Sequence, residues 1–130
     1  MLCSFPFFYR WIMTIQEAIA RIDDLKPNAY DVPHKMSWLS EVDGKIYNEV
    51  ISYHDDDTTW QPYDVTTTEL IAKEPYSELY IYYMAAMIDY WNGDTQRYNN
   101  DMQMFNDAYR GFTDNYIKKH KSTGYRKFKL

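Results

Sequence analysis

The segment YSELYIYYMAAMIDYWNGD, residues 76–94, places five tyrosines and one tryptophan in a single stretch of helix length. Glu78 and Asp89 bracket only ten residues, whereas a membrane-spanning helix needs about 20 mostly apolar ones. A membrane span is therefore not expected. As a helix, the segment is apolar on nearly all sides, which is typical of a helix covered by several neighbours. It predicts either the centre of a helical bundle or a helix that faces another protein.

A first helix is predicted near the N-terminus. Thr14 and Glu17 have the spacing of a capping box, in which each side chain bonds the backbone N–H of the other residue at a helix start. Apolar residues then recur at helical spacing until the sequence KPN interrupts them, which predicts a helix over residues 15–25. Because this start directly follows Met13, that methionine is a second candidate for the native start. The residues before it would then be an extension or an arm.

A second helix is predicted from about residue 33 onward. Pro33 suits the first turn of a helix, where a backbone N–H has no partner to lose. One apolar face then extends to about Ser52 and is marked by Met36, Leu39, Val42, Ile46 and Val50. Gly44 inside this helix lowers helix propensity by about 1 kcal/mol relative to alanine. We therefore expect a close packing contact at Gly44.

A long loop and a fourth helix complete the pattern. Residues 54–68, HDDDTTWQPYDVTTT, show no helical period and are rich in Asp and Thr, which predicts a loop. Pro75 is expected to open the aromatic helix, and Asn92-Gly93 to close it. The fourth helix is predicted by large apolar residues three and four positions apart, namely Tyr98, Met102, Phe105, Tyr109, Phe112 and Tyr116. A shorter row on this helix is small enough for another backbone to approach and consists of Met104, Ala108 and Gly111.

These patterns predict an all-α fold: a small bundle of about four helices with a long loop between helices two and three and a basic C-terminal tail. The chain has 130 residues, which suits one compact domain. We divide it into an N-terminal extension or arm at 1–12, a helical domain at 13–120 and the basic tail at 121–130.

Charge is distributed unevenly along the chain. Residues 118–130 hold six of the fourteen lysines and arginines and no acid, so that residues 1–117 keep all nineteen acids and a net charge of −11. An acidic body does not favour nonspecific binding of nucleic acid. We therefore interpret the tail first as an arm that docks onto an acidic, partly apolar protein groove, second as a solvated chain end, and third as a nucleic-acid contact.

The sequence contains no catalytic or metal-binding motif that we can identify. His54 and the three following aspartates lack the spacing of a calcium loop, so a solvated acidic loop is the preferred interpretation. His34 and His120 have no nucleophile or orienting acid at a recognisable spacing. The single Cys3 cannot form an intramolecular disulfide, which fits a reducing compartment. We expect neither enzymatic activity nor a cofactor.

The aromatic content predicts contacts with other molecules. A domain of this size offers the aromatic helix only three neighbours, and tyrosine and tryptophan are enriched at protein interfaces. We expect an oligomer or a docked partner, with a tyrosine-rich monomeric core as the alternative. The expected subunit-packing residues are Tyr80, Tyr82, Trp91, Met104, Ala108 and Gly111.

Three stretches in this order resemble one family: TIQEAIARIDDLKPN, KMSWLSEVDGKIYNEV, and the run from ELIAKEPYSELY to NDAYRGF. The chain is similar there to the small helical head–tail connector, or adaptor, proteins of tailed phages and prophages of Gram-positive bacteria. The similarity covers about residues 13–120 and is strongest in YWNGDTQRYNNDMQMFN. It implies a structural protein of the virion neck, made in the host cytoplasm, that forms a dodecameric ring beneath the portal and contacts a lower neck or tail-completion protein.

The resemblance does not itself assign partner contacts, so the roles of the charged segments are expected from charge and from the geometry of a ring. The portal or a neighbouring subunit is the expected partner of Lys118, Lys119, Lys121, Tyr125, Arg126, Lys127, Phe128 and Lys129. An acidic lumen would let genomic DNA pass without specific binding. The expected channel-lining residues are Asp55, Asp56 and Asp57. The alternative function is a small helical DNA-binding or regulatory protein that uses the basic C-terminal tail.

Overall fold

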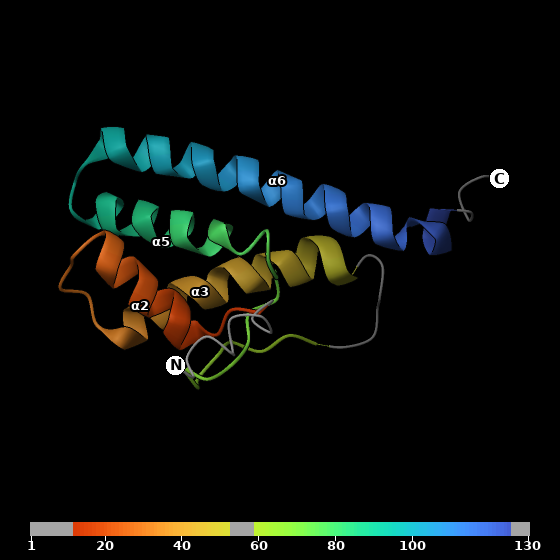
Figure 1. Cartoon of the computed structure of the whole chain (residues 1–130), viewed down its shortest axis with the longest axis horizontal. Coiled ribbons are helices and arrows are strands. Elements are labelled where there is room, and N and C mark those ends of the chain that lie inside the picture. The colour runs from red at the N-terminus through yellow and green to blue at the C-terminus, as the bar shows by residue number, and fades with distance from the viewer. Residues whose placement is uncertain (1–11, 53–58, 126–130) are drawn as a thin grey trace, which may run out of the picture.

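The computed structural model describes the backbone of residues 12–52 and 59–125 and the side chains of these residues up to His120. Its helices are α2 (Ile15–Leu25), α3 (Val32–Ile46), the π-helix η1 (Tyr47–Ile51) that continues α3, α5 (Glu78–Trp91) and α6 (Thr95–Tyr125). α5 and α6 lie antiparallel and side by side, while α2 and α3 pack on the other side of α5 (Figure 1). The predicted all-α bundle of about four helices is confirmed.

Helix α2 begins where the capping box predicts. The Thr14 backbone N–H donates to Glu17 Oε1 over 3.0 Å, and the Glu17 backbone N–H donates to Thr14 Oγ1 over 3.2 Å. Satisfying these two donors fixes the first turn. The helix then buries one face against the core through Ile15, Ala18, Ile19 and Ile22.

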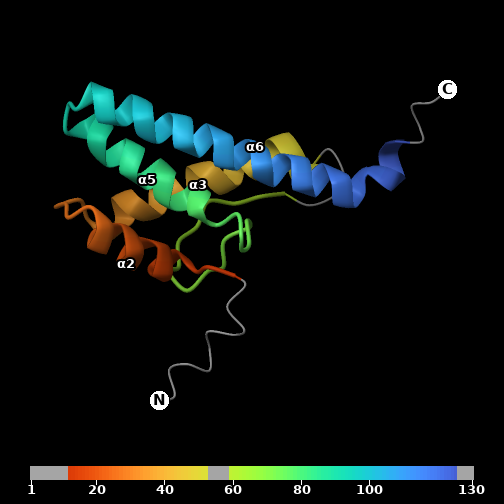
Figure 2. The same cartoon turned by 45° about the horizontal axis from the view of Figure 1, so that its top comes forward.

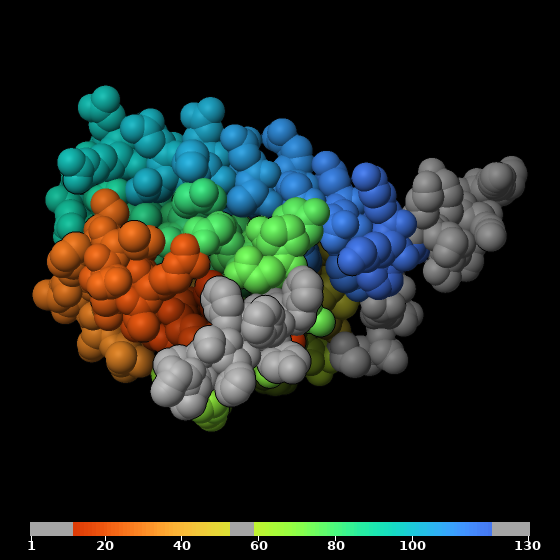
Figure 3. Space-filling model, in the orientation of Figure 1, coloured from red at the N-terminus to blue at the C-terminus, as the bar shows by residue number. Residues whose placement is uncertain are grey.

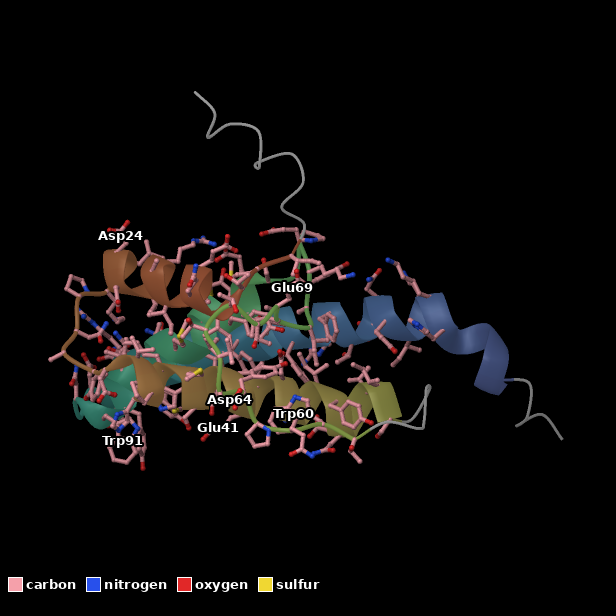
Figure 4. The ribbon with its side chains drawn as sticks, turned by 90° about the horizontal axis from the view of Figure 1, so that it is seen from below. Asp24, Glu41, Trp60, Asp64, Glu69 and Trp91 are labelled. Carbon is pink, nitrogen blue, oxygen red and sulfur yellow. The ribbon has the colours of Figure 1, made fainter. Side chains whose placement is uncertain are left out.

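Helix α3 makes the close contact that Gly44 predicts. Asp31 caps its start by accepting a hydrogen bond from the backbone N–H of His34. Gly44 is buried, and a Cβ added there would lie only 3.1 Å from the indole ring of Trp60. The absence of a side chain at Gly44 thus makes room for Trp60, which comes from the loop that follows η1. Figure 4 shows Trp60 beside this part of α3.

The segment 59–77 between η1 and α5 contains no helix and is held in place by hydrogen bonds. The Leu70 backbone N–H donates to the carbonyl oxygen of Met13, and the Ile15 backbone N–H donates to that of Thr68. Leu70 and Ala72 are buried in the core. The loop therefore packs as part of the bundle and connects the start of α2 to α3.

Helix α5 begins later than the sequence predicts. Pro75 lies in a turn in which the Tyr76 backbone N–H donates to the carbonyl oxygen of Lys73, and the helix starts only at Glu78. The prediction that Pro75 opens the helix is wrong by three residues, because the turn comes first. Gly93 closes the helix as expected, with a φ of 82° that favours glycine.

Helix α6 follows the predicted seam and extends beyond the predicted end of the helical domain. Phe105 and Phe112 are buried, and the other seam residues are partly buried. The helix has 31 residues, which corresponds to a length of about 46 Å at 1.5 Å per residue. It ends at Tyr125, past residue 120, and its last turns project beyond the other helices (Figure 2).

Candidate interaction surfaces

Among the described residues, four of the seven exposed large apolar side chains lie at one end of the bundle. We define the aromatic end by Leu25, Val32, Tyr90, Trp91 and Tyr98, which come from the end of α2, the start of α3, the end of α5 and the first turn of α6. Leu25 is 63% exposed, Tyr90 53% and Trp91 62%. The Tyr90 ring makes an edge contact with Trp91 and a tilted contact with Tyr98. The aromatic end thus exposes two adjacent rings, those of Tyr90 and Trp91, to solvent.

Polar contacts fix the α2–α3 connection against the end of α5. The Tyr30 hydroxyl donates to Asn92 Oδ1 over 2.9 Å, and the Lys26 ammonium pairs with Asp89 Oδ1 at 3.1 Å. These contacts keep the parts of the aromatic end together at the left of Figure 1.

Beneath the aromatic end lies a pair of carboxyl groups from α5 and α6. Asp89 Oδ2 and Asp101 Oδ2 are buried, and within the described residues neither accepts a hydrogen bond from an N–H group or a hydroxyl, which leaves the two carboxyls to share a proton. Burial, a hydrogen bond with Asp89 and the negative charge of Asp89 raise the pKa of Asp101 to about 7, while Lys26 and Arg97 oppose this shift. A proton held between the two carboxyls would stabilise the contact between α5 and α6.

A second surface lies near the opposite end of α6. We define the cationic groove as the hollow of about 680 Å³ between the loop before α5 and the C-terminal half of α6. Its floor is mainly apolar and its rim carries two exposed lysines; its lining comprises Ile12, Ile71, Lys73, Glu74, Pro75, Tyr76, Phe112, Asn115, Tyr116, Lys119 and His120. In Figure 3 the green atoms of the loop meet the blue atoms of α6 at this position.

The strongest internal polar cluster surrounds Asp43 of α3. Its carboxylate accepts hydrogen bonds from the Tyr80 hydroxyl at 2.6 Å, the Tyr63 hydroxyl at 2.7 Å and the Ile71 backbone N–H at 3.0 Å. Asp43 and Tyr80 are both fully buried. The cluster joins the loop to α3 and α5, and because Asp43 and Tyr80 have no exposed surface we assign it a structural role.

Burial raises the pKa of the Asp43 carboxyl to about 6, although its three hydrogen bonds act in the opposite direction. A folded-state pKa above the unfolded value of 3.8 means that the native protein binds more protons between these pH values, so its stability rises as the pH falls through about 6. Between pH 7.5 and pH 5 we expect Asp43 to add about 1 kcal/mol to the free energy of unfolding. Asp101 acts in the same direction from about pH 7.

Urea denaturation of the wild type and of Asp43→Asn at both pH values measures this effect. The asparagine variant lacks the titrating group and should lose the Asp43 part of the pH dependence, while the Asp101 part remains. Identical pH dependences in the two proteins would contradict the assignment.

The expected subunit-packing residues differ in how far they are exposed to solvent. Tyr80 has no exposed surface, so its assignment to subunit packing is wrong: its hydroxyl belongs to the Asp43 cluster, and its ring belongs to the core. Tyr82 and Ala108 are partly buried and pack against the same core. Gly111 faces the ring of Tyr76 at an ordinary packing distance. The two exposed members of the set are Trp91 and Met104.

The residues expected to contact the portal or the DNA channel lie partly outside the described chain. Lys118 and Lys119 are exposed on α6, and Lys119 lines the cationic groove. Lys121 and Tyr125 belong to the last part of α6, of which only the backbone is described. The remaining residues of both sets lie outside the described residues; they are Asp55, Asp56, Asp57, Arg126, Lys127, Phe128 and Lys129.

Two features escaped the sequence-based predictions. The cationic groove draws its lining from residue 12, residues 71–76 and residues 112–120, and no local pattern connects these segments. Asp43 did leave a signal, because it follows Leu39 by four positions and precedes Ile46 by three on the apolar side of its helix. A charged residue at such a position predicts buried hydrogen-bond donors nearby.

Fold and surfaces together define a small all-α bundle protein with two candidate contact regions. Comparisons with protein-family models, curated proteins and solved structures find no significant match for this chain. Among the described helices, none combines the length and the apolar character that crossing a membrane requires. Within the same residues, no group of three or more His, Cys, Asp or Glu side chains is placed to hold a metal ion.

Proposed function

We propose that this protein is a structural subunit of a phage head–tail connector, in which copies form a ring between the portal and the lower neck or tail-completion protein. A dodecamer is the proposed ring size. The proposed location is the neck of the virion, after synthesis in the host cytoplasm. Genomic DNA would pass through the ring without specific binding, and the role requires neither a cofactor nor catalysis.

The observation that carries this proposal is the presence of two unlike surfaces on one small protomer. The aromatic end and the cationic groove differ in charge, composition and position along α6. A ring of identical subunits needs two different faces on each copy, because every contact joins one face to the other. The resemblance of three sequence stretches within residues 13–120 to head–tail connector proteins points to the same class of function.

Immunogold electron microscopy of purified phage particles, with quantitative mass spectrometry of the same particles, tests the proposal. We expect label at the junction of head and tail and about a dozen copies per particle, as the proposed ring requires. Particles that lack the protein, or carry it elsewhere, would refute the connector role. Induction of a strain without the gene is the control and should yield particles with heads and tails unjoined.

The exposed lysines of α6 favour one second candidate, a DNA-binding or regulatory protein. Lys118 and Lys119 are exposed near the end of a helix and precede four further basic residues in the sequence. Neutralising several phosphates would make duplex binding fall steeply as salt rises. Duplex binding with this salt dependence, lost when residues 118–130 are deleted, would favour the second candidate. The connector role predicts no such binding.

A further inference from the structure

We propose that the aromatic end of one copy docks into the cationic groove of the next copy, with Trp91 seated on the aromatic floor of the groove. This inference rests on the proposed function and deepens it, because it names the two surfaces through which copies join. The occupant of the groove is a second copy of this chain.

The apolar parts of the two surfaces match in kind. Trp91 is 62% exposed on the protomer and offers a large apolar ring for a partner to cover. The floor of the groove presents the rings of Tyr76, Phe112 and Tyr116, with Tyr76 and Phe112 in edge contact. Its volume of about 680 Å³ lies within the range of about 300–1,000 Å³ that is usual for binding pockets. Aromatic pairs gain stability beyond the area that they bury.

The charges around the two surfaces are complementary. Asp24 and Asp31 are exposed at the end of α2 and just before the start of α3, and Figure 4 shows Asp24 at the same end of the bundle as Trp91 but on its opposite side. The rim of the groove carries the exposed Lys73 and Lys119, with Glu74 as the acid in its lining. Opposite potentials on two surfaces steer association and fix the orientation of the partners.

The positions of the two surfaces on the protomer determine what kind of assembly the docking would form. α6 starts at the aromatic end and reaches the groove at Phe112, seventeen residues after Thr95, which is about 25 Å along the helix axis. A copy cannot fill its own groove with an end that lies on the far side of its rigid bundle. Each copy therefore offers one end and one groove, and repeated docking gives a closed ring or an open filament.

The composition of the groove favours a protein segment over nucleic acid. Phosphate contacts need cations at the surface, and among the described lining residues Lys73 and Lys119 are the only lysines or arginines. The apolar floor and Glu74 add nothing to phosphate binding, whereas both suit a protein surface that combines an aromatic ring with charged neighbours.

Two complementary variants test this inference by sedimentation velocity. The end variant carries Trp91→Asp, and the groove variant carries Lys73→Glu with Lys119→Glu. All three positions are exposed, so the fold should persist, which circular dichroism checks. We expect self-association of the wild type and at least a tenfold weakening in each variant alone. An equimolar mixture should form a one-to-one pair and nothing larger, because only one intact end and one intact groove are present.

Matched control variants carry the same types of substitution at other positions on the surface. Val65→Asp adds an acid at another exposed apolar residue, and Arg110→Glu reverses a charge on the outer side of α6. Both controls should associate like the wild type. If the end and groove variants also associate normally, the inference fails while the connector role stands. If the wild type remains monomeric at every concentration, the inference also fails. The connector role fails only if the protein is absent from phage particles.

Discussion

Replacing Asp43 with alanine is expected to lower the free energy of unfolding by about 3 kcal/mol. The substitution removes the acceptor for three donors, of which the Tyr80 hydroxyl is fully buried and the Ile71 backbone N–H is in the packed loop. Neither donor can reach bulk water without disturbing the core. The loss should appear in urea denaturation at pH 7, with faster proteolysis in the segment 59–77.

The same loop supplies the control for this experiment. Asp64 is an exposed aspartate one residue after Tyr63, and Asp64→Ala should change the free energy of unfolding by less than about 0.5 kcal/mol. A double-mutant cycle with Tyr63→Phe should be non-additive, because each change removes the same hydrogen bond. An Asp43→Ala variant as stable as Asp64→Ala would show that the Asp43 cluster does not hold the loop.

Replacing Gly44 with leucine is expected to lower the free energy of unfolding by about 2 kcal/mol, despite the higher helix propensity of leucine. A Cβ at Gly44 already lies within 3.1 Å of the Trp60 ring, so the larger side chain must displace the indole. Thermal and urea denaturation measure the loss. Quenching of tryptophan fluorescence by acrylamide should increase as Trp60 becomes exposed.

In a protein that already carries Trp60→Ala, the Gly44→Leu substitution is expected to stabilise the fold instead. Without the indole, leucine at position 44 has room, and its helix propensity should raise stability by up to about 1 kcal/mol relative to Trp60→Ala alone. Asn106→Leu on the exposed side of α6 is the control for added apolar surface and should be nearly neutral. If leucine at position 44 is equally destabilising with and without Trp60, the contact with the indole is not the cause.

Local signals predicted the helices well because the physics that positions them is local. The capping box at Thr14 and the glycine at position 93 each act within a few residues, and both appear in the structure. The seam of α6 is likewise a repeat within one helix. Pro75 misled the prediction, because a proline is equally suited to the turn that precedes α5.

The contact surfaces were only partly predictable, because they depend on residues that are far apart in the sequence. An excess of aromatic residues indicated that some would remain exposed, and Trp91 does so. The pattern could not separate Trp91 from Tyr80, because the buried Tyr80 hydroxyl finds its acceptor in Asp43, which is 37 residues away in the sequence. Likewise, the basic segment was predicted as a tail after residue 120, whereas the backbone continues as helix to Tyr125.

The groove exists only in the native chain, because its walls come from three segments that are distant in sequence. Any molecule that fills it therefore binds the folded state alone and shifts the folding equilibrium toward that state. A ligand at a hundred times its dissociation constant adds about 2.7 kcal/mol in this way. If each copy fills the groove of another, the melting temperature should rise with protein concentration. The thermal shift then measures the fraction of grooves that are filled.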